Sequence, residues 1–243
     1  MKQLDSTAHP ASPGEKPVSE SSRPDIFSVR LADTLARYRQ HALSYDASAQ
    51  RTMWIRRRTI DKLELRPGDR VLDIACGTGL SLDALQQRVG PNGAVFGIEV
   101  SPEMIDVARQ RVASNRWQNV HLHQAAVEEA DIPGRFDAVL FHFTHDVMRS
   151  KPALQRVFAS LKSDARVAMA GMKFAPRWMA PVNVIVRAQA RPYMATFDGL
   201  ETPWDLAMAH VDGFERQSVL FGTGYIGWGR VRARPGPSSP AAA

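Results

Sequence analysis

The segment Asp73-Ile74-Ala75-Cys76-Gly77-Thr78-Gly79 restricts what this chain can fold into more than any other part of the sequence. It contains the end of an apolar run, residues 71–75, that is typical of a buried strand, and a helical pattern begins near Leu80. Glycines two positions apart let the backbone turn tightly and approach a ligand closely, where a Cβ atom would collide. The first N–H groups of the following helix face whatever lies in that turn. A strand, a glycine turn and a helix in this order predict a loop that holds a nucleoside-type cofactor.

Strand-like and helix-like patterns alternate through the rest of the chain. The predicted strands are residues 71–75, 94–99, 120–123, 136–143 and 166–172, with a closing hairpin formed by residues 218–221 and 225–231. The predicted helices are residues 49–63, 80–89 and 101–112, with a fourth behind Pro152 whose apolar face carries Leu154, Val157, Phe158 and Leu161. We expect Ser101 to cap the third helix, because Pro102 and Glu103 suit its first turn. This alternation predicts an α/β fold, a doubly wound parallel sheet with helices on both faces.

Length and composition set the domain organisation. With 243 residues the chain suits one sizeable domain that needs no disulfide or metal to stabilise it. We expect that domain at residues 26–232, between disordered tails at residues 1–25 and 233–243, because both ends are of low complexity and lack apolar periodicity. Cys76 is the single cysteine, which excludes an intramolecular disulfide and a thiolate cluster, and we predict no metal site. No apolar run reaches about 18 residues and no signal core is visible, so we expect a cytoplasmic protein.

The chain is basic, with 31 Lys and Arg residues against 25 Asp and Glu residues and a formal charge of +6. This balance favours anionic ligands or surfaces without naming one. Arg56-Arg57-Arg58 lies in the first predicted helix, and we interpret the run as a solvated helix face in preference to a phosphate site.

An acidic residue ends the second predicted strand. Glu99 follows Gly79 by 20 residues, the position from which a carboxylate accepts hydrogen bonds from a ribose diol. A nicotinamide dinucleotide fingerprint would need a third glycine three residues after Gly79, and Leu82 stands there. No Tyr-x-x-x-Lys pair is present either. An NAD(P)-dependent oxidoreductase on the same kind of sheet is therefore the weaker alternative.

The glycine motif, with Asp73 before it, resembles motif I of class I S-adenosylmethionine-dependent methyltransferases. Tyr45-Asp46, ahead of the first predicted helix, is similar to the Tyr-Asp of many methyltransferases of the ubiquinone/menaquinone-biosynthesis group, and residues 136–139 resemble the family's fourth strand. The resemblance covers roughly residues 45–172. It implies a Rossmann-like, mostly parallel seven-stranded sheet with a C-terminal antiparallel hairpin, and S-adenosyl-L-methionine as the cofactor. It also implies an N-terminal lid at residues 26–48 and an acceptor-lid insertion at residues 173–203.

The same resemblance implies which residues form the cofactor site. They are Tyr45, Asp73, Ala75, Gly77, Gly79, Glu99, Val100, Met104, Ala126 and Phe141. In the family the glycine loop packs against the methionyl and ribose parts of the cofactor, and the acid at the position of Glu99 holds the ribose hydroxyls. The chain departs from the family where an acid often binds the adenine amino group, because Ala125-Ala126 stands there. Backbone groups, Gln124 or Glu128 are the alternatives for that contact.

Acceptor chemistry is expected just after the fourth predicted strand, because open α/β sheets bind ligands at the carboxyl ends of their strands. His145 beside Asp146 is the candidate general base near neutral pH, with a satisfied structural histidine as the competing interpretation. We interpret His142 as a core residue. No Asn-Pro-Pro-Tyr or Asp-Pro-Pro-Tyr follows this strand, Cys76 lies inside the cofactor loop, and no lysine-rich appendage is present. These absences disfavour nucleic acid, protein amides and arsenic, and leave a small-molecule acceptor.

Residues 165–197 contain five basic residues, many apolar residues and no acidic one. We interpret this stretch as an apolar lid with a positive rim, suited to an amphipathic or anionic acceptor such as a quinol precursor, a lipid headgroup or an aromatic acid. An ordinary amphipathic packing helix is the alternative. The same features leave open a peripheral contact with a membrane or lipid, and the sequence indicates no oligomeric state. A module that binds S-adenosylmethionine without catalysis is a further alternative to the enzyme.

Overall fold

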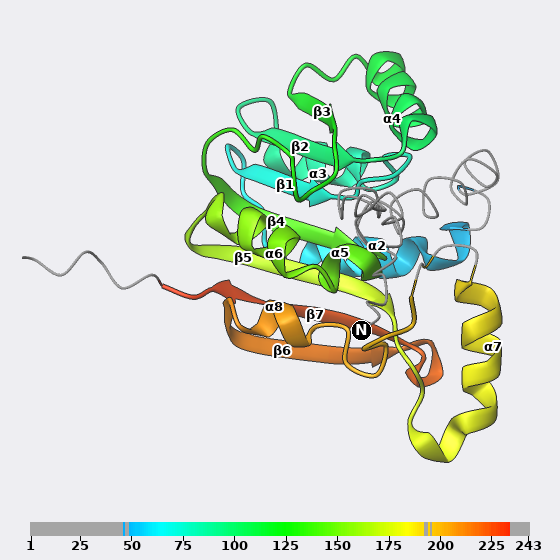
Figure 1. The fold of residues 1–243 in the computed structure, drawn as a ribbon. Helices are drawn as coiled ribbons and strands as arrows, with labels where there is room; N and C mark the ends of the chain where they lie inside the picture. The colour runs from blue at the N-terminus through cyan, green and yellow to red at the C-terminus, as the bar shows by residue number, and fades with distance from the viewer. Residues whose placement is uncertain (1–45, 47–48, 192–193, 195, 234–243) are drawn as a thin grey trace, which may run out of the picture.

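A seven-stranded sheet with the strand order β3-β2-β1-β4-β5-β7-β6 forms the centre of the molecule (Figure 1). The structure is a computed structural model that describes residues 46, 49–191, 194 and 196–233. The strands are β1 Arg70–Ile74, β2 Ala94–Glu99, β3 Val120–Gln124, β4 Phe136–His142, β5 Leu161–Met172, β6 Val211–Val219 and β7 Gly224–Val231. The pairs from β3 to β5 are parallel, whereas β7 is antiparallel to both β5 and β6. The predicted α/β sheet with its C-terminal antiparallel hairpin is thereby confirmed.

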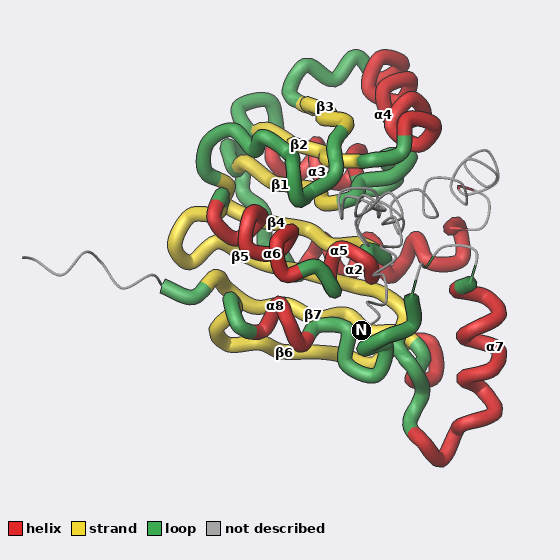
Figure 2. Tube along the Cα trace, in the orientation of Figure 1, coloured by secondary structure: helices red, strands yellow, loops and turns green. Residues whose placement is uncertain are grey.

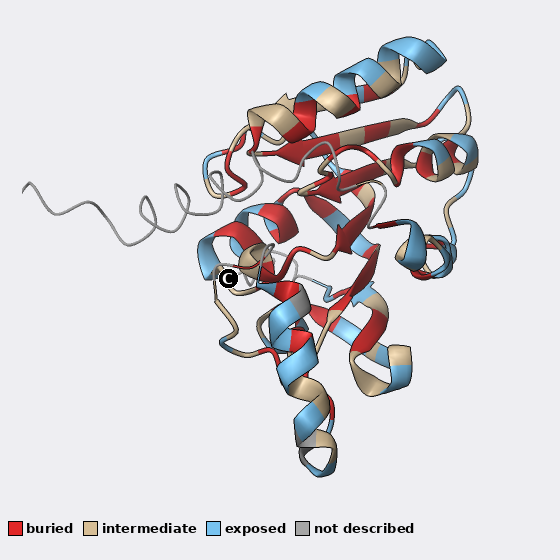
Figure 3. Cartoon of the chain, turned by 90° about the vertical axis from the view of Figure 1, so that its right-hand side faces the viewer, coloured by how far each residue is buried: buried red, intermediate tan, exposed pale blue. Residues whose placement is uncertain are grey.

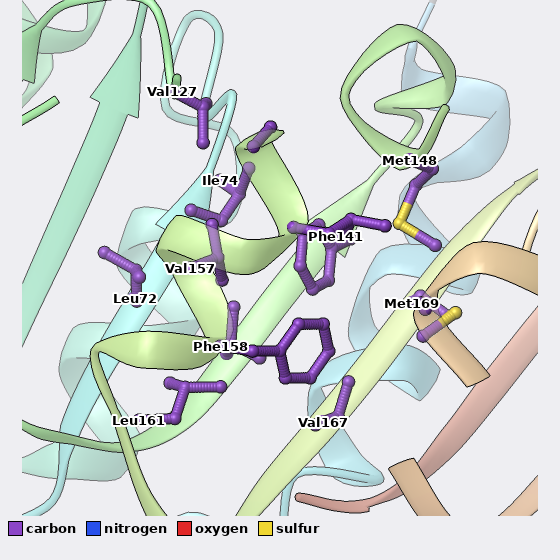
Figure 4. Close-up of a cluster of buried hydrophobic side chains, with 14 of the residues drawn as sticks. Leu72, Ile74, Val127, Phe141, Met148, Val157, Phe158, Leu161, Val167 and Met169 are labelled. Atoms are coloured by element: carbon purple, nitrogen blue, oxygen red, sulfur yellow. The ribbon is translucent and has the colours of Figure 1, made fainter. Parts of the chain in front are cut away.

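Helices cover both faces of the sheet (Figure 2). On one face lie α2 Met53–Asp61, preceded by the short helix η2 Gln50–Thr52, then α3 Leu82–Val89 and α4 Pro102–Asn115. On the other lie α5 His145–Met148, α6 Lys151–Ala159 and α8 Asp205–Met208. Each face has its own apolar core, one including Val71 and Leu85, the other including Leu72 and Phe158. Figure 4 shows the second of these cores, where side chains of α6 pack onto β1, β4 and β5.

The start of α4 follows from its sequence. The Ser101 hydroxyl accepts a hydrogen bond from the Met104 backbone N–H at 3.3 Å, and Pro102 occupies the first turn, where its missing N–H has no helical partner to lose. The predicted cap is therefore confirmed. The helix continues three residues beyond the predicted end, to Asn115, and stops where Arg116 adopts a left-handed conformation.

Two predicted elements toward the C-terminal side, α6 and β6, have wrong bounds. Leu161 does not continue the apolar face of α6, because that helix ends at Ala159 and Leu161 begins β5. β6 begins at Val211, seven residues before the predicted strand, and Phe221 lies outside it in the short helix η4 Leu220–Gly222. β6 is an edge strand whose side chains are mostly exposed and polar, so its sequence lacks the apolar alternation on which strand prediction depends.

The parallel strands bring their carboxyl ends to one edge of the sheet, where the glycine loop after β1, Glu99 of β2 and the segment after β4 lie next to one another. Beyond the end of β5, the short helix η3 Arg177–Met179 and α7 Ala180–Ala190 form a lobe that projects from the sheet (Figures 1 and 3). None of the helices in the described part of the chain is long and apolar enough to cross a bilayer. Nearly all of the predicted tails and of the expected N-terminal lid, Tyr45 included, lies outside the described residues. The described part includes only Asp46 of the lid and residue 233 of the C-terminal tail.

Candidate cofactor and acceptor site

The glycine loop is a sharp turn tied to the neighbouring strand. The Cys76 N–H donates to the Ile98 carbonyl of β2 at 3.0 Å, and the Gly79 N–H donates back to the Cys76 carbonyl at 3.0 Å. Gly77 and Gly79 have φ values of +58° and +80°, which favour glycine. A Cβ on Gly79 would lie 2.6 Å from Cδ1 of Leu82, whereas a Cβ on Gly77 would meet nothing within 4 Å. Gly79 is thus needed for packing, and Gly77 leaves open space above the loop.

Glu99 supports this loop from below. Its Oε2 accepts from the Gly77 N–H at 2.9 Å and its Oε1 accepts from the Ser101 N–H at 2.8 Å. Burial raises the pKa of Glu99, and hydrogen bonds from the backbone of Ser101, Gly77 and Val100 partly offset this effect. Each carboxylate oxygen keeps a lone pair that could accept a hydrogen bond from a diol beside the loop.

Asp73 is a second carboxylate under the same loop, and it lacks a complete set of partners. Its side chain is 1% exposed, and Oδ2 has no hydrogen-bond partner among the described residues. Burial raises the pKa of Asp73 to about 7, Arg56 lowers it and Glu99 raises it further. Two carboxylates buried together are costly unless a positive charge lies close by. Arg56 supplies part of that positive charge, and a cationic ligand such as a sulfonium would add to it.

Arg56 is a residue of this site that the sequence interpretation placed wrongly. Arg57 and Arg58 are exposed as expected, but Arg56 is buried. Its Nη1 lies 3.5 Å from the hydroxyl oxygen of Ser81, which in turn lies 2.9 Å from Nδ1 of His142. A run of three arginines suggested a solvated face, yet residue 56 follows Met53 by three and precedes Ile60 by four. That helical spacing, which puts it on the apolar stripe, is the signal that could have identified it.

Arg56 also connects the cofactor loop to the acceptor segment. Its guanidinium carbon lies 5.2 Å from the ring centroid of Phe143, the residue that follows β4. Phe143 has a φ of 58°, and Ala75, which follows β1, has a φ of 50°. Non-glycine residues rarely adopt this conformation, and here two of them end neighbouring strands at the ligand edge. His142 is buried as predicted, and burial holds its pKa well below its ordinary value.

Asp46, the second residue of the Tyr-Asp pair, lies beside the glycine loop. Oδ1 of Asp46 accepts from the Thr78 hydroxyl at 2.5 Å, and its Oδ2 forms an ion pair with Arg111 of α4 at 2.7 Å. Arg111 also donates to the Thr78 carbonyl at 3.1 Å. Asp46 thus fastens the chain before η2 to the glycine loop, next to Tyr45 in the sequence.

The remaining residues expected around the cofactor are not equally placed. Val100 follows Glu99 directly, the buried Met104 lies in the first turn of α4, and Ala126 is buried after β3. The Ala125 N–H donates to the Glu99 carbonyl at 3.1 Å, which brings this turn to the site. By contrast, the Phe141 ring is buried in the core against Phe158, with 6.4 Å between ring centroids. Only its backbone is left to face a ligand.

The three alternatives for the adenine contact differ in their surroundings. Glu128 accepts a hydrogen bond from the Ser150 hydroxyl at 2.6 Å, so its carboxylate is engaged at the start of α6. Gln124 is exposed at the end of β3. Backbone groups of the turn at residues 125–127 are the third alternative, and the choice among the three stays a prediction.

His145 lies at the start of α5, close to Asp198 of the predicted acceptor lid. Burial lowers the pKa of His145 to about 4, and the Asp198 backbone and carboxylate offset this only in part. Neither ring nitrogen completes a hydrogen bond with a described residue. Burial thus favours the neutral ring, and the role of His145 as a general base stays a prediction. Across the described residues, no three His, Cys, Asp or Glu side chains gather into a possible metal site.

Comparison with known proteins finds similarity to methyltransferases. A family model described as a methyltransferase domain matches residues 65–216, more than half of the chain. An arsenite methyltransferase from Halobacterium salinarum is 35% identical over 94 residues, which are 39% of this chain and 24% of that protein. A demethylmenaquinone methyltransferase from Symbiobacterium thermophilum is 31% identical over 160 residues, 63% of this chain and 62% of that protein. The chain thus spans less than two thirds of the length of these relatives.

Solved structures agree on the fold. A SAM-dependent methyltransferase from Aquifex aeolicus superimposes with a TM-score of 0.54 at 21% identity, over 72% of this chain and 89% of that one. The fold and the matched family residues both include the glycine loop and Glu99.

Proposed function

This chain belongs to the family of S-adenosyl-L-methionine-dependent methyltransferases, and we propose that it is an enzyme that methylates an amphipathic small molecule of the quinol-precursor type. The observation that carries the proposal is the pair of buried carboxylates, Asp73 and Glu99, beneath a glycine loop with open space above it. The cofactor supplies an electrophilic methyl group on a positively charged sulfur, with a neutral thioether as the leaving group. A site that binds such a cation needs negative charge nearby.

Each cofactor-side residue has a separate proposed role. Gly77 and Gly79 let the backbone turn against the ligand, and Glu99 accepts the ribose hydroxyls with the lone pairs that Gly77 and Ser101 leave unused. Asp73 balances the positive charge of the ligand. Arg56 lowers the pKa of Asp73 and so favours the ionised carboxylate that this role requires. Tyr45, next to the anchored Asp46, is the proposed lid contact.

The acceptor-side residues position the acceptor and exclude water. With its pKa at about 4, the His145 ring is neutral at physiological pH and is a weak proton acceptor. We assign it, with Asp146, to hydrogen bonding of an acceptor that binds as its phenolate or enolate, after its proton has passed to bulk water. Aligning the acceptor with the methyl group supplies the larger share of the rate in this chemistry. A phenolic or enolic acceptor, which can ionise in water before it binds, therefore fits this site.

Two further observations favour a quinol-type acceptor. The relative from Symbiobacterium thermophilum is named for demethylmenaquinone, and the segment after β5 is apolar with a basic rim. The relative named for arsenite is the less suitable guide, since the one cysteine of this chain, Cys76, is buried in the cofactor loop. Leu82 packs against Gly79 where a nicotinamide site needs glycine, which disfavours the oxidoreductase. We propose the cytoplasm as the location, because a chain with a single cysteine forms no intramolecular disulfide and suits a reducing compartment.

Transfer of labelled methyl groups tests the proposal. The chain is incubated with methyl-labelled S-adenosylmethionine and, in separate reactions, a demethylated quinol, an aromatic acid and phosphoethanolamine. We expect label in the extracted quinol, loss of that label in Glu99→Ala, and no loss in Glu215→Ala, which changes an exposed residue of the far edge strand β6. Binding of S-adenosylhomocysteine without transfer to any acceptor would support the non-catalytic binding module instead.

A further inference from the structure

The most exposed large apolar side chains of the described residues lie on the lobe formed by η3 and α7, and on η4. Trp178 of η3 is 81% exposed and Phe221 of η4 is 96% exposed. Val184 and Ile185 are exposed on α7. Isolated apolar side chains are common on protein surfaces, but three on this lobe and a fourth on η4, two of them aromatic, mark an interaction surface.

The segments that carry the two aromatic side chains are held together. The Lys173 backbone N–H donates to the Thr223 carbonyl at 2.9 Å, and its Nζ donates to the Gly222 carbonyl at 2.6 Å. A Cβ on Gly222 would lie 3.6 Å from Cδ of Pro176, which precedes η3. The segment that leads into η3 therefore lies against η4.

α7 is apolar on two faces. Its inner face contributes to a small core under the lobe, whose buried members are Phe174, Val186, Ala190, Met194 and Leu200. Val184 and Ile185 point away from that core and are exposed. A helix that has apolar residues on its outer face needs a second partner on that side.

The backbone of η4 holds an aromatic ring outward. Leu220 and Phe221 have φ values of 51° and 52°, a conformation that is unfavourable for both residue types. Leu220 packs against a core cluster with Val219 and Ile226, whereas the Phe221 ring is almost fully exposed. The strained turn thus gains packing from one residue and presents the next to its surroundings.

The lobe is rich in basic residues. Residues 165–197 contain no acid, and Arg187 and Arg191 are exposed at the end of α7. The Arg187 guanidinium carbon lies 4.6 Å from the Phe174 ring centroid, so the basic group sits over the core of the lobe. Basic residues on the same lobe as exposed aromatic and branched side chains complement anionic lipid headgroups and the interface beneath them.

We propose that η3, α7 and η4 form a docking surface that inserts Trp178, Val184, Ile185 and Phe221 into the interface of an anionic lipid bilayer. The exposed apolar side chains stand on two separate segments, residues 177–190 and η4, which suits a deformable lipid surface better than the matched groove of a protein. The lobe also follows β5 at the sheet edge that carries the glycine loop. Docking would therefore turn the acceptor side toward the bilayer, a consequence that rests on the proposed function, whereas the docking itself does not.

Vesicle sedimentation tests the docking surface. The full chain, without cofactor, is mixed with vesicles of phosphatidylcholine alone or of phosphatidylcholine and phosphatidylglycerol in equal parts. We expect binding to the anionic vesicles, weakened by salt, and a loss of about tenfold or more in partitioning for the double variant Trp178→Ala/Phe221→Ser. Met208→Ser, which removes an exposed apolar side chain from α8, is the matched control and should bind unchanged.

Thermal unfolding of each variant shows whether it is folded. If the double variant is unfolded, the single variants Trp178→Gln and Phe221→Gln are tested in its place. Wild-type protein that stays in the supernatant, or a double variant that sediments like wild type, overturns the proposal. A dimer seen by sedimentation velocity without vesicles, and lost in the double variant, would assign the surface to a second copy of the chain and also overturn it. S-adenosylhomocysteine calorimetry reports on the proposed function separately, because it involves no lipid.

Discussion

Glu99→Gln tests the support of the cofactor loop by an isosteric change. The carboxylate accepts one N–H on each oxygen, from Gly77 at 2.9 Å and from Ser101 at 2.8 Å. A glutamine keeps one acceptor oxygen and turns an NH2 group toward the other N–H, so one buried donor loses its partner. It also replaces a charged acceptor of the ribose hydroxyls with a neutral one. Hydrogen bonds to charged groups contribute about 1.5–3 kcal/mol, which corresponds to roughly 10- to 150-fold in affinity.

Calorimetry with S-adenosylhomocysteine measures this loss, with Glu215→Gln as a control because that side chain is exposed on β6. An analogue that lacks the ribose 2′-hydroxyl separates the two effects. If Glu99 holds the diol, the variant should weaken binding of the analogue much less than binding of the parent ligand. Equal losses for both ligands would limit Glu99 to a role in loop structure, and unchanged affinity would refute the reasoning altogether.

Three other substitutions probe the same site. Since the pKa of Asp73 is raised to about 7, wild-type affinity for S-adenosylmethionine should fall below that pH as the carboxyl becomes neutral, and calorimetry should find Asp73→Asn nearly insensitive. The raised pKa means that the folded state binds the proton more tightly than the unfolded state, and the stability that this gives is lost as pH rises through about 7. Asparagine carries no such charge, so we expect the free energy of unfolding of Asp73→Asn to exceed that of wild type most clearly at higher pH. Arg56→Met removes a buried positive charge beside Asp73 and should cost about 3 kcal/mol in denaturant unfolding, against no more than about 0.5 kcal/mol for the exposed Arg57→Met; equal costs would contradict the buried network. Gly79→Ala should lower the melting temperature more than Gly68→Ala, because both have positive φ but only Gly79 has Leu82 within 2.6 Å of the new Cβ; the reverse order would refute the packing argument.

The sequence predicts best where local signals and tertiary structure agree. β1 and β2 are short apolar runs next to a glycine turn, and the structure gives β2 the predicted bounds. Ser101 and Pro102 define the start of α4 through contacts within a single turn. Glu99 could be placed at the loop because strand ends in a parallel sheet share an edge.

Features that depend on distant contacts were not predictable in the same way. Arg56 is buried because the helix that carries it packs beside Ser81 and Phe143, neither of which marks residue 56 in the sequence. The pKa of His145 depends on burial beside Asp198, more than 50 residues further along the chain. β6 has few inward-facing apolar residues, so its composition does not indicate a strand. It forms one because it pairs with β7.

A crystal structure of the chain with S-adenosylhomocysteine is the most direct test of the central claim, that two buried carboxylates beneath the glycine loop hold the cofactor. The account predicts both ribose hydroxyls within hydrogen-bonding distance of the Glu99 carboxylate, and the sulfur on the side of residues 142–146. A ligand bound elsewhere, or a Glu99 carboxylate that contacts only Gly77 and Ser101 while the ribose lies apart from it, would contradict the account.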